Sequence, residues 1–167
     1  MNINLNKLKE PYVIVLIGPP LVGKSTWIKK NFLEKGKEVN IISRDQILLD
    51  VSDSDDYDTA FKNVDQKRVN QLLDSSLKNA NNNEDNVIID MTNMTSKRRR
   101  TTLDYFDDNY NKIAIIFPLL EWNEMIRRNS NRQKEENKTI PENVLRNMLS
   151  SYQPIRDDEG FDRVVSL

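Results

Sequence analysis

The run YVIVLI, residues Tyr12–Ile17, leads without a break into the segment GPPLVGKST, residues 18–26. The run has the continuous apolar, β-branched composition of a strand that is buried on both faces of a parallel sheet. The segment fits the pattern G-x-x-x-x-G-K-[ST] through Gly18, Gly23, Lys24 and Ser25. Since a helix is predicted from Thr26 onward, the pattern lies between a strand and a helix, the context in which it forms a phosphate-binding loop.

The chemistry of this segment points to a nucleoside triphosphate. Glycine permits backbone angles that turn N–H groups toward a ligand, and the N-terminus of the following helix adds free donors and the positive end of its dipole. Lys24 is expected to reach the β- and γ-phosphates and Ser25 to bind Mg²⁺, with Thr26 beside it on the nucleotide. A glycine-containing turn without a ligand is the alternative, and the flanking strand and helix favour the nucleotide site.

Composition limits the remaining chemistry. The 167 residues are 37% hydrophobic and 31% charged with a formal net charge of −1, which fits one globular domain over residues 1–167. Cys and His are absent, which excludes disulfides, thiolate metal sites and a histidine general base. The first residues lack the apolar core of a signal peptide and no apolar run could span a bilayer, so we expect an intracellular, cytoplasmic protein without a membrane partner.

Strands and helices are predicted to alternate along the chain. Four runs resemble the first strand: Glu38–Ser43, Asn86–Asp90, Lys112–Phe117 and Asp162–Leu167. Helical stretches lie between and after them: Thr26–Lys35, Tyr57–Ala80, Ser96–Asn111, Glu121–Lys134 and Pro141–Tyr152. The acidic run from Asp50 to Asp58 has the composition of a loop. This order predicts an α/β fold, a three-layer α/β/α sandwich around a mostly parallel five-stranded sheet.

Arg44 and Asp45 follow the second predicted strand. In an open α/β sheet the carboxyl ends of the strands line the ligand crevice, which brings Asp45 near the phosphates. A kinase that phosphorylates a hydroxyl uses a carboxylate to accept or orient its proton, and in a chain without histidine Asp45 is the best candidate. The alternative is that Asp45 caps a short helix that begins near Gln46.

Asp90 occupies the same place after the third predicted strand, in the segment NVIIDMTN. A carboxylate at a strand end beside a phosphate loop can hold Mg²⁺, usually through water. Thr92 and Asn93 add short polar side chains to the same rim. The alternative for Asp90 is a cap on the helix that starts near Ser96.

Two basic segments, Lys97–Arg100 and Arg127–Lys134, concentrate positive charge. Arg128 and Arg132 are four residues apart and therefore share one helical face. Such segments are usually solvated helix faces. A basic helix that leads into a polar loop also resembles the lid of a small kinase, here about residues 127–140, whose arginines close over the transferring phosphoryl group. For Lys97–Arg100 the choice between a solvated helix start and a phosphodiester contact stays open.

Taken together, the chain resembles the P-loop kinase domain of the 5′-polynucleotide kinases that heal RNA and DNA ends, especially the phage-type enzymes. The resemblance runs through nearly the whole chain. The segments that carry it are GPPLVGKSTW, SRDQ, DMTN followed by SKRR, RRNSNR followed by IPENVLRNM, and EGFDRVV.

The resemblance implies a P-loop NTPase fold of the kinase type with a helical lid, and transfer of the ATP γ-phosphate to a 5′-hydroxyl end of RNA or DNA. By position, Lys24 and Ser25 hold ATP·Mg²⁺, Asp45 activates the 5′-hydroxyl, and Arg132 contacts phosphates from the lid with Arg128 nearby. The segment from Asp90 to Asn93 forms part of the floor under the acceptor and the metal.

The acceptor is the least constrained part of this prediction. Three residues beyond Asp45, where the phage-type enzymes carry an arginine for the acceptor phosphate, the chain has Leu48. Arg44 or the Lys97–Arg100 cluster, which includes Arg98, would have to replace that arginine. The competing hypotheses are a small-molecule kinase for a nucleoside, sugar or antibiotic, and a nucleotide-dependent binding module without acceptor chemistry.

Overall fold

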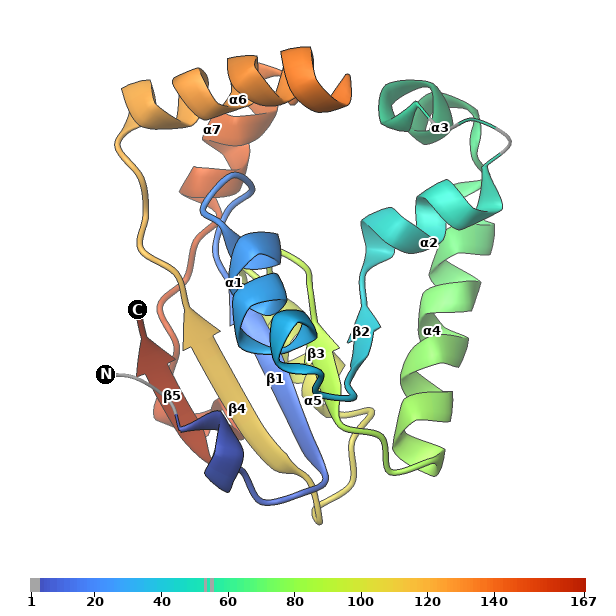
Figure 1. Cartoon of the computed structure of the whole chain (residues 1–167), viewed down its shortest axis with the longest axis vertical. Helices are drawn as coiled ribbons and strands as arrows, with labels where there is room; N and C mark the ends of the chain where they lie inside the picture. The colour runs from blue at the N-terminus through green and yellow to red at the C-terminus, as the bar shows by residue number, and fades with distance from the viewer. Residues whose placement is uncertain (1–3, 53, 55) are drawn as a thin grey trace.

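The computed structural model describes residues 4–52, 54 and 56–167. Its five strands form one parallel sheet in the order β2-β3-β1-β4-β5 (Figure 1). The strands are β1 Tyr12–Ile17, β2 Asn40–Ile42, β3 Val87–Ile89, β4 Asn111–Ile116 and β5 Arg163–Ser166. All five predicted strands are therefore present, although four of them have shifted or shorter bounds.

β1 lies at the centre of the sheet because it is apolar on both faces. It pairs with β3 on one side and with β4 on the other, in a register that sets Tyr12 opposite Asn111 and Ile17 opposite Ile116. All six of its residues are buried. Alternate side chains point to opposite faces of a strand. β1 accordingly contributes to two separate hydrophobic clusters, one on each face of the sheet.

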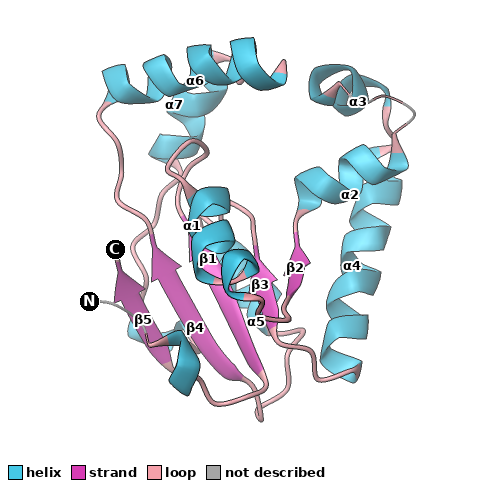
Figure 2. Cartoon of the chain, viewed as in Figure 1, coloured by secondary structure: helices cyan, strands magenta, loops and turns pink. Residues whose placement is uncertain are grey.

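Helices cover both faces of the sheet, as Figure 2 shows. On one face, Ile28 of α1 (Lys24–Asn31) and Phe32 pack against Ile14 and Leu16 of β1. On the other face, α4 (Gln66–Asn82) and α5 (Ser96–Leu103) bury their apolar sides against β1 and β3. The predicted three-layer α/β/α sandwich of the P-loop kinase type is thus confirmed.

The single helix predicted over Tyr57–Ala80 is wrong. Two helices occupy this stretch, α3 (Tyr57–Asn63) and α4. Asp65 causes the break, because its side chain accepts a hydrogen bond from Lys67 N and caps α4. The chain can therefore turn, so that α3 lies over α2 while α4 packs on the sheet.

Other element boundaries also differ from the prediction. α5 ends at Leu103 instead of continuing to Asn111, and Tyr110 just before β4 turns inward, where its hydroxyl donates to the carbonyls of Ala80 and Asp85. The predicted acidic loop is partly helical, since α2 spans Arg44–Val51. Residues 53 and 55 of that run lie outside the described residues.

The remaining helices form the upper part of the molecule in Figure 1. α6 (Trp122–Glu136) and α7 (Glu142–Ser150) follow β4, and the guanidinium of Arg146 lies 4.0 Å from the centre of the Trp122 ring. Single 3₁₀ turns occur at Leu5–Lys7, Leu33–Lys35 and Asp157–Glu159. No helix in the described part of the chain has the length and apolar character needed to cross a bilayer.

A buried ion pair joins α5 to the last 3₁₀ turn. The Arg99 guanidinium donates to both carboxylate oxygens of Glu159, at 2.6 and 2.7 Å, and both side chains are fully buried. It also donates to the carbonyls of Asn93, Met94 and Pro154. Arg100 pairs with Asp158. Half of the basic segment Lys97–Arg100 is therefore structural, and Arg99 fixes the loop that follows β3.

We expect Arg99→Met to lower the free energy of unfolding by about 3–5 kcal/mol, because it leaves the Glu159 carboxylate buried without its partner. Urea denaturation measures the change. The control is Lys78→Met, which removes an exposed pair with Asp74 and should cost less than about 1 kcal/mol. Equal losses in the two variants would contradict the structural role of Arg99.

Candidate functional site

The loop between β1 and α1 is shaped by its glycines. A Cβ on Gly18 would lie 3.0 Å from Cβ of Phe117 and 3.1 Å from Cγ2 of Val22, so a side chain there would force its neighbours to shift. Gly23 has a φ of 98°, a left-handed conformation that other residues rarely adopt. The N–H of Gly18 donates to the carbonyl of Thr92, which ties the loop to the segment after β3. The loop is thus fixed to the carboxyl edge of the sheet.

α1 presents its N-terminus to this loop. Gly23 precedes the helix and has no side chain to cap it, so the first N–H groups of α1 face the loop without a side-chain acceptor. The hydroxyl-bearing residues Ser25 and Thr26 are exposed in the first turn. Free N–H donors and the positive end of the helix dipole together favour an anion at this position.

Lys24 folds back over the loop. Its Nζ donates to the carbonyls of Gly18 at 2.9 Å and Pro19 at 2.7 Å. Burial lowers the pKa of Lys24 to about 8, while the nearby carboxylates Asp90 and Asp45 act to raise it. The ammonium group is therefore held among carbonyl oxygens inside the loop, where a phosphate oxygen would be a better partner.

Asp90 lies just beyond β3, and its N–H donates to the carbonyl of Ile42. Burial raises its pKa, and the charge of Asp45 adds to that rise, while Lys24 and Lys138 oppose it. The helix-cap alternative does not hold, because Thr95 caps α5 by accepting from Arg98 N. Asp90 thus shares one electrostatic environment with Lys24 and Asp45.

Asp45 lies in the first turn of α2, beyond the end of β2. Ser43 is the residue that caps this helix, by accepting from Gln46 N, so the cap alternative for Asp45 fails as well. Oδ1 of Asp45 accepts from the Tyr57 hydroxyl at 2.9 Å, and Oδ2 lies 3.5 Å from Nζ of Lys138. The carboxylate is exposed toward the crevice and held from two sides.

The lid contacts the phosphate loop directly. Nη1 of Arg128 donates to the carbonyl of Leu21 at 2.9 Å, and its Nε donates to Glu124. Leu21 has a φ of 74°, an unusual conformation for a residue other than glycine. Arg132 pairs with Glu136. Its positive charge also lowers the pKa of Lys24 through charge repulsion.

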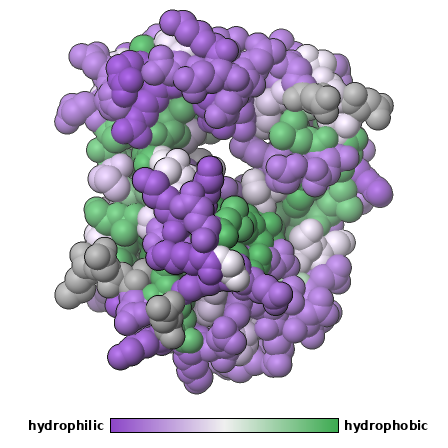
Figure 3. Space-filling view, in the orientation of Figure 1, coloured by the Kyte–Doolittle hydropathy of each residue, from purple (hydrophilic) through white to green (hydrophobic). Residues whose placement is uncertain are grey.

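Two asparagines brace the lid. The Asn129 amide both donates to and accepts from the backbone of Ile140, which closes the turn after α6. Asn137 Nδ2 donates to Asp56 at 2.7 Å, which joins the end of the lid to α3. Figure 3 shows hydrophilic side chains over the lid and a hollow beneath it, between α1 and the α2–α3 region.

The other predicted site residues have different surroundings. Asn93 is a correction: it is 1% exposed and donates to the carbonyls of Leu16 and Met91, so it supports the sheet and does not face a ligand. Thr92 is half-buried beside the loop. Arg44 donates to Gln66 and Asn70. Arg98 is exposed, and its guanidinium makes no hydrogen bond or ion pair with a described residue.

The site residues fit a nucleoside triphosphate with Mg²⁺. The loop is shaped by glycines and lies at the N-terminus of α1. The ammonium group of Lys24 lies inside the loop. No cluster of three metal-ligating side chains occurs in residues 4–52, 54 and 56–167. Mg²⁺ commonly takes one or two protein ligands together with substrate phosphates. Ser25 and Asp90 would hold it in that way.

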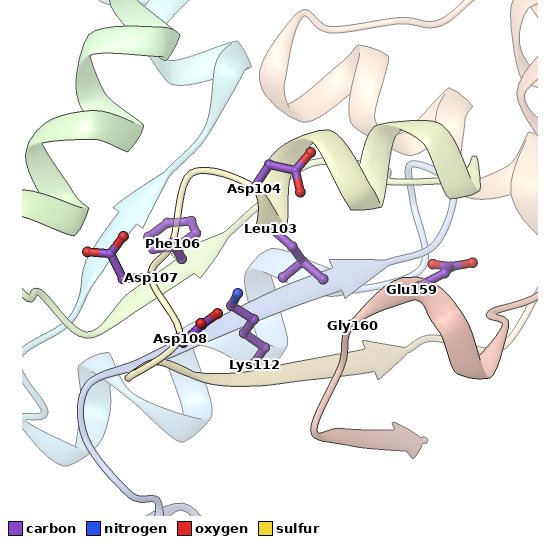
Figure 4. Close-up of a pocket in the computed structure, with 8 residues that line it drawn as sticks. All are labelled: Leu103, Asp104, Phe106, Asp107, Asp108, Lys112, Glu159 and Gly160. Carbon is purple, nitrogen blue, oxygen red and sulfur yellow. The ribbon is translucent and has the colours of Figure 1, made fainter.

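A different hollow lies at the opposite, amino-terminal edge of the sheet (Figure 4). Its volume is about 500 Å³. Its lining includes Leu103, Asp104, Phe106, Asp107, Asp108, Lys112, Glu159 and Gly160. The aspartates give it a negative potential that disfavours phosphate. This hollow is therefore not a candidate for a phosphate site.

Three residues of the site were not predicted from the sequence. The sequence places Lys138 in a polar loop, Tyr57 at the start of a predicted helix, and Asn129 only within the basic segment Arg127–Lys134. A signal existed for Tyr57, since the hydroxyl of a partly buried tyrosine usually has a hydrogen-bond partner. Lys138 and Asn129 act through contacts that the fold alone brings about.

Comparison with known proteins agrees with this geometry. A family described as "AAA domain" matches residues 13–155. The L-seryl-tRNA(Sec) kinase of Methanococcus maripaludis is 31% identical over 143 residues, which are 84% of this chain and 52% of that protein. The chain thus spans about half the length of this relative.

Solved structures share the fold at low identity. Kti12 of Chaetomium thermophilum in complex with ADP-AlF3 has a TM-score of 0.64 at 14% identity, over 93% of this chain and 88% of that one. A chain of the Pnkp1/Rnl/Hen1 complex has a TM-score of 0.55 at 19% identity, over 95% of this chain and 45% of that one.

The pKa of Lys24 predicts how nucleotide binding depends on pH. A phosphate binds the protonated lysine better, so the affinity for ATP should fall as pH rises above about 8, approaching roughly tenfold per pH unit. Calorimetric titration from pH 7 to 9.5 measures this. Lys24→Arg, which stays protonated, should show no such fall, whatever its affinity at pH 7. Parallel curves for the two proteins would contradict the prediction.

Proposed function

Because this chain belongs to the AAA domain family, which matches residues 13–155, we propose that it is an ATP-dependent kinase acting on the 5′-hydroxyl end of RNA or DNA. One observation carries the proposal: Asp45 follows β2 at the carboxyl edge of the parallel sheet, the same edge at which the phosphate loop with Lys24 follows β1. A binding module without acceptor chemistry would need the loop and Asp90, but neither Asp45 nor the lid arginines.

The roles of the residues follow from their positions. Asp45 accepts the proton of the acceptor hydroxyl. At the same time the hydroxyl oxygen forms a bond to the γ-phosphorus, and the bond from that phosphorus to ADP breaks. Lys24, from the loop, and Arg132, from the lid, stabilise the charge that spreads over the phosphoryl oxygens. Mg²⁺ held by Ser25 and Asp90 would neutralise charge on the β- and γ-phosphates.

The surroundings of Asp45 support a nucleic acid as the acceptor. Leu48 is fully buried against Ala60 and Val69, so this position offers no acceptor contact. Arg44 is bound only by amide oxygens among the described residues, which leaves its charge available to an acceptor phosphate. The resemblance to 5′-polynucleotide kinases in the sequence motifs favours the same acceptor class.

A second acceptor deserves a test because of the Methanococcus relative. That protein is a kinase of L-seryl-tRNA(Sec), and its likeness to this chain extends over 143 residues. A seryl hydroxyl carried by tRNA is an alcohol attached to RNA, so the same base and donor site would serve it. The 5′-hydroxyl remains the first proposal, on the motifs quoted above.

We predict that Asp45→Asn lowers the rate of phosphoryl transfer by about 1,000-fold and leaves ATP affinity within about twofold, because the amide keeps the shape but cannot accept the proton. Transfer from γ-labelled ATP is measured with 5′-hydroxyl RNA, 5′-hydroxyl DNA, seryl-tRNA and free nucleosides. Label on RNA or DNA ends supports the proposal. Label only on seryl-tRNA or on nucleosides would show that the proposed acceptor is wrong. Full activity in the variant would show that Asp45 takes no part in the mechanism.

Arg132→Ala is predicted to lower kcat by roughly 100-fold, since it removes a cation that acts on the transferring phosphoryl group. Arg127→Ala is the matched control. Its side chain lies on the same helix, is largely exposed and pairs with Glu124, so kcat should change less than about twofold. If the two variants turned over at the same rate, the lid assignment would be wrong.

A further inference from the structure

Three separate parts of the chain meet at the Asp45 carboxylate. Tyr57, at the start of α3, donates its hydroxyl hydrogen to Oδ1. Lys138, just after α6, lies near Oδ2 and also over the Tyr57 ring, with 4.1 Å between Nζ and the ring centre. Lys138 is largely buried, with 15% of its side chain exposed, although it is a lysine in a loop. An acidic residue in the first turn of a helix can be fully solvated, whereas Asp45 is contacted by side chains from two other parts of the chain.

We propose that Tyr57 is a positioning residue for the general base: its hydroxyl holds Oδ1 of Asp45, so that Oδ2 is the oxygen presented to the acceptor hydroxyl. This inference rests on the proposed function, in which Asp45 is the base. An exposed carboxylate on a helix has several rotamers, and only some of them face the donor. A fixed hydrogen bond to one oxygen selects among them at no cost at the moment of reaction.

The Tyr57 ring is itself held in place. It stacks on Phe61 one helical turn later, with 6.2 Å between the ring centres and 28° between the planes. Lys138 covers the ring from the lid. Burial, together with the nearby Asp45 charge, raises the pKa of Tyr57, so its hydroxyl keeps its proton and remains a donor over the whole working pH range.

Lys138 marks the place of the acceptor. At 3.5 Å its contact with Oδ2 is long for a charge-assisted hydrogen bond, whereas the contact of Tyr57 with Oδ1 is of ordinary length. An incoming hydroxyl would therefore displace Lys138 from Oδ2 more readily than it would displace Tyr57 from Oδ1. The proton of that hydroxyl then passes to Oδ2 as the phosphorus–oxygen bond forms.

The test is Tyr57→Phe, which removes only the hydroxyl and keeps the ring for Phe61 and Lys138. We expect kcat to fall roughly tenfold, the usual loss for one hydrogen bond to a charged group, with KM for ATP unchanged. Tyr105→Phe is the matched control, because its hydroxyl makes the same kind of bond to Asp74, at 2.7 Å, outside the site. Its kcat should equal that of the wild type.

Two measurements separate this inference from the proposed function. Slow hydrolysis of ATP, in which water replaces the acceptor, is followed in parallel, so the comparison does not depend on the acceptor class. Tyr57→Phe is also combined with Asp45→Asn, and the double variant should be no slower than Asp45→Asn alone.

The outcomes then differ. Wild-type rates in Tyr57→Phe, together with the large loss in Asp45→Asn, would overturn the positioning role and leave the base in place. A further tenfold loss in the double variant, relative to the residual rate of Asp45→Asn, would show that Tyr57 acts independently of Asp45, which also overturns it. A wild-type rate in Asp45→Asn would instead refute the proposed function.

Discussion

The ammonium group of Lys24 rests on the carbonyl oxygens of Gly18 and Pro19, inside the turn between β1 and α1. This placement is possible only because glycines shape the turn and because no side chain caps the N-terminus of α1. A cation, free N–H groups and a helix dipole then point at one small volume. The rest of the structure serves to fix that volume and to bring carboxylates and arginines to its edge.

Parallel strands supply the edge. β1, β2 and β3 all end beside the loop, and the residues that follow them carry Gly18, Asp45 and Asp90. The lid closes over the same place through contacts of Arg128 with Leu21 and of Asn137 with Asp56. The phosphate loop, Asp45 and the lid arginines thus lie on three separate elements, each anchored by its own hydrogen bonds.

The sequence predicted the parts of the fold and site that depend on local chemistry. The bounds of β1 and the position of Lys24 were readable because a buried strand and a phosphate loop each have a composition of their own. The prediction of one helix over Tyr57–Ala80 failed because the side chain of Asp65 caps α4 and so divides this stretch into two helices. The sequence places Asp45 and Asp90 at strand ends, but it does not predict which side chains contact them.

Long-range pairing accounts for most of what the sequence did not predict. Arg99 stands in a run of three arginines, and only its contact with Glu159, sixty residues away, makes it a core residue. Tyr57 and Lys138 become relevant because the fold brings α3 and the lid to Asp45. Asn93 looked like a rim residue, but the turn after β3 directs its side chain into the core.

The most direct measurement is a crystal structure of the protein with a non-hydrolysable ATP analogue and Mg²⁺. The account predicts a triphosphate bound by the backbone of residues 18–25, with Lys24 Nζ moved from the Gly18 and Pro19 carbonyls to the β- and γ-phosphates. Asp45 would face the γ-phosphate across the crevice. A nucleotide bound elsewhere, or a Lys24 still on both carbonyls, would contradict it.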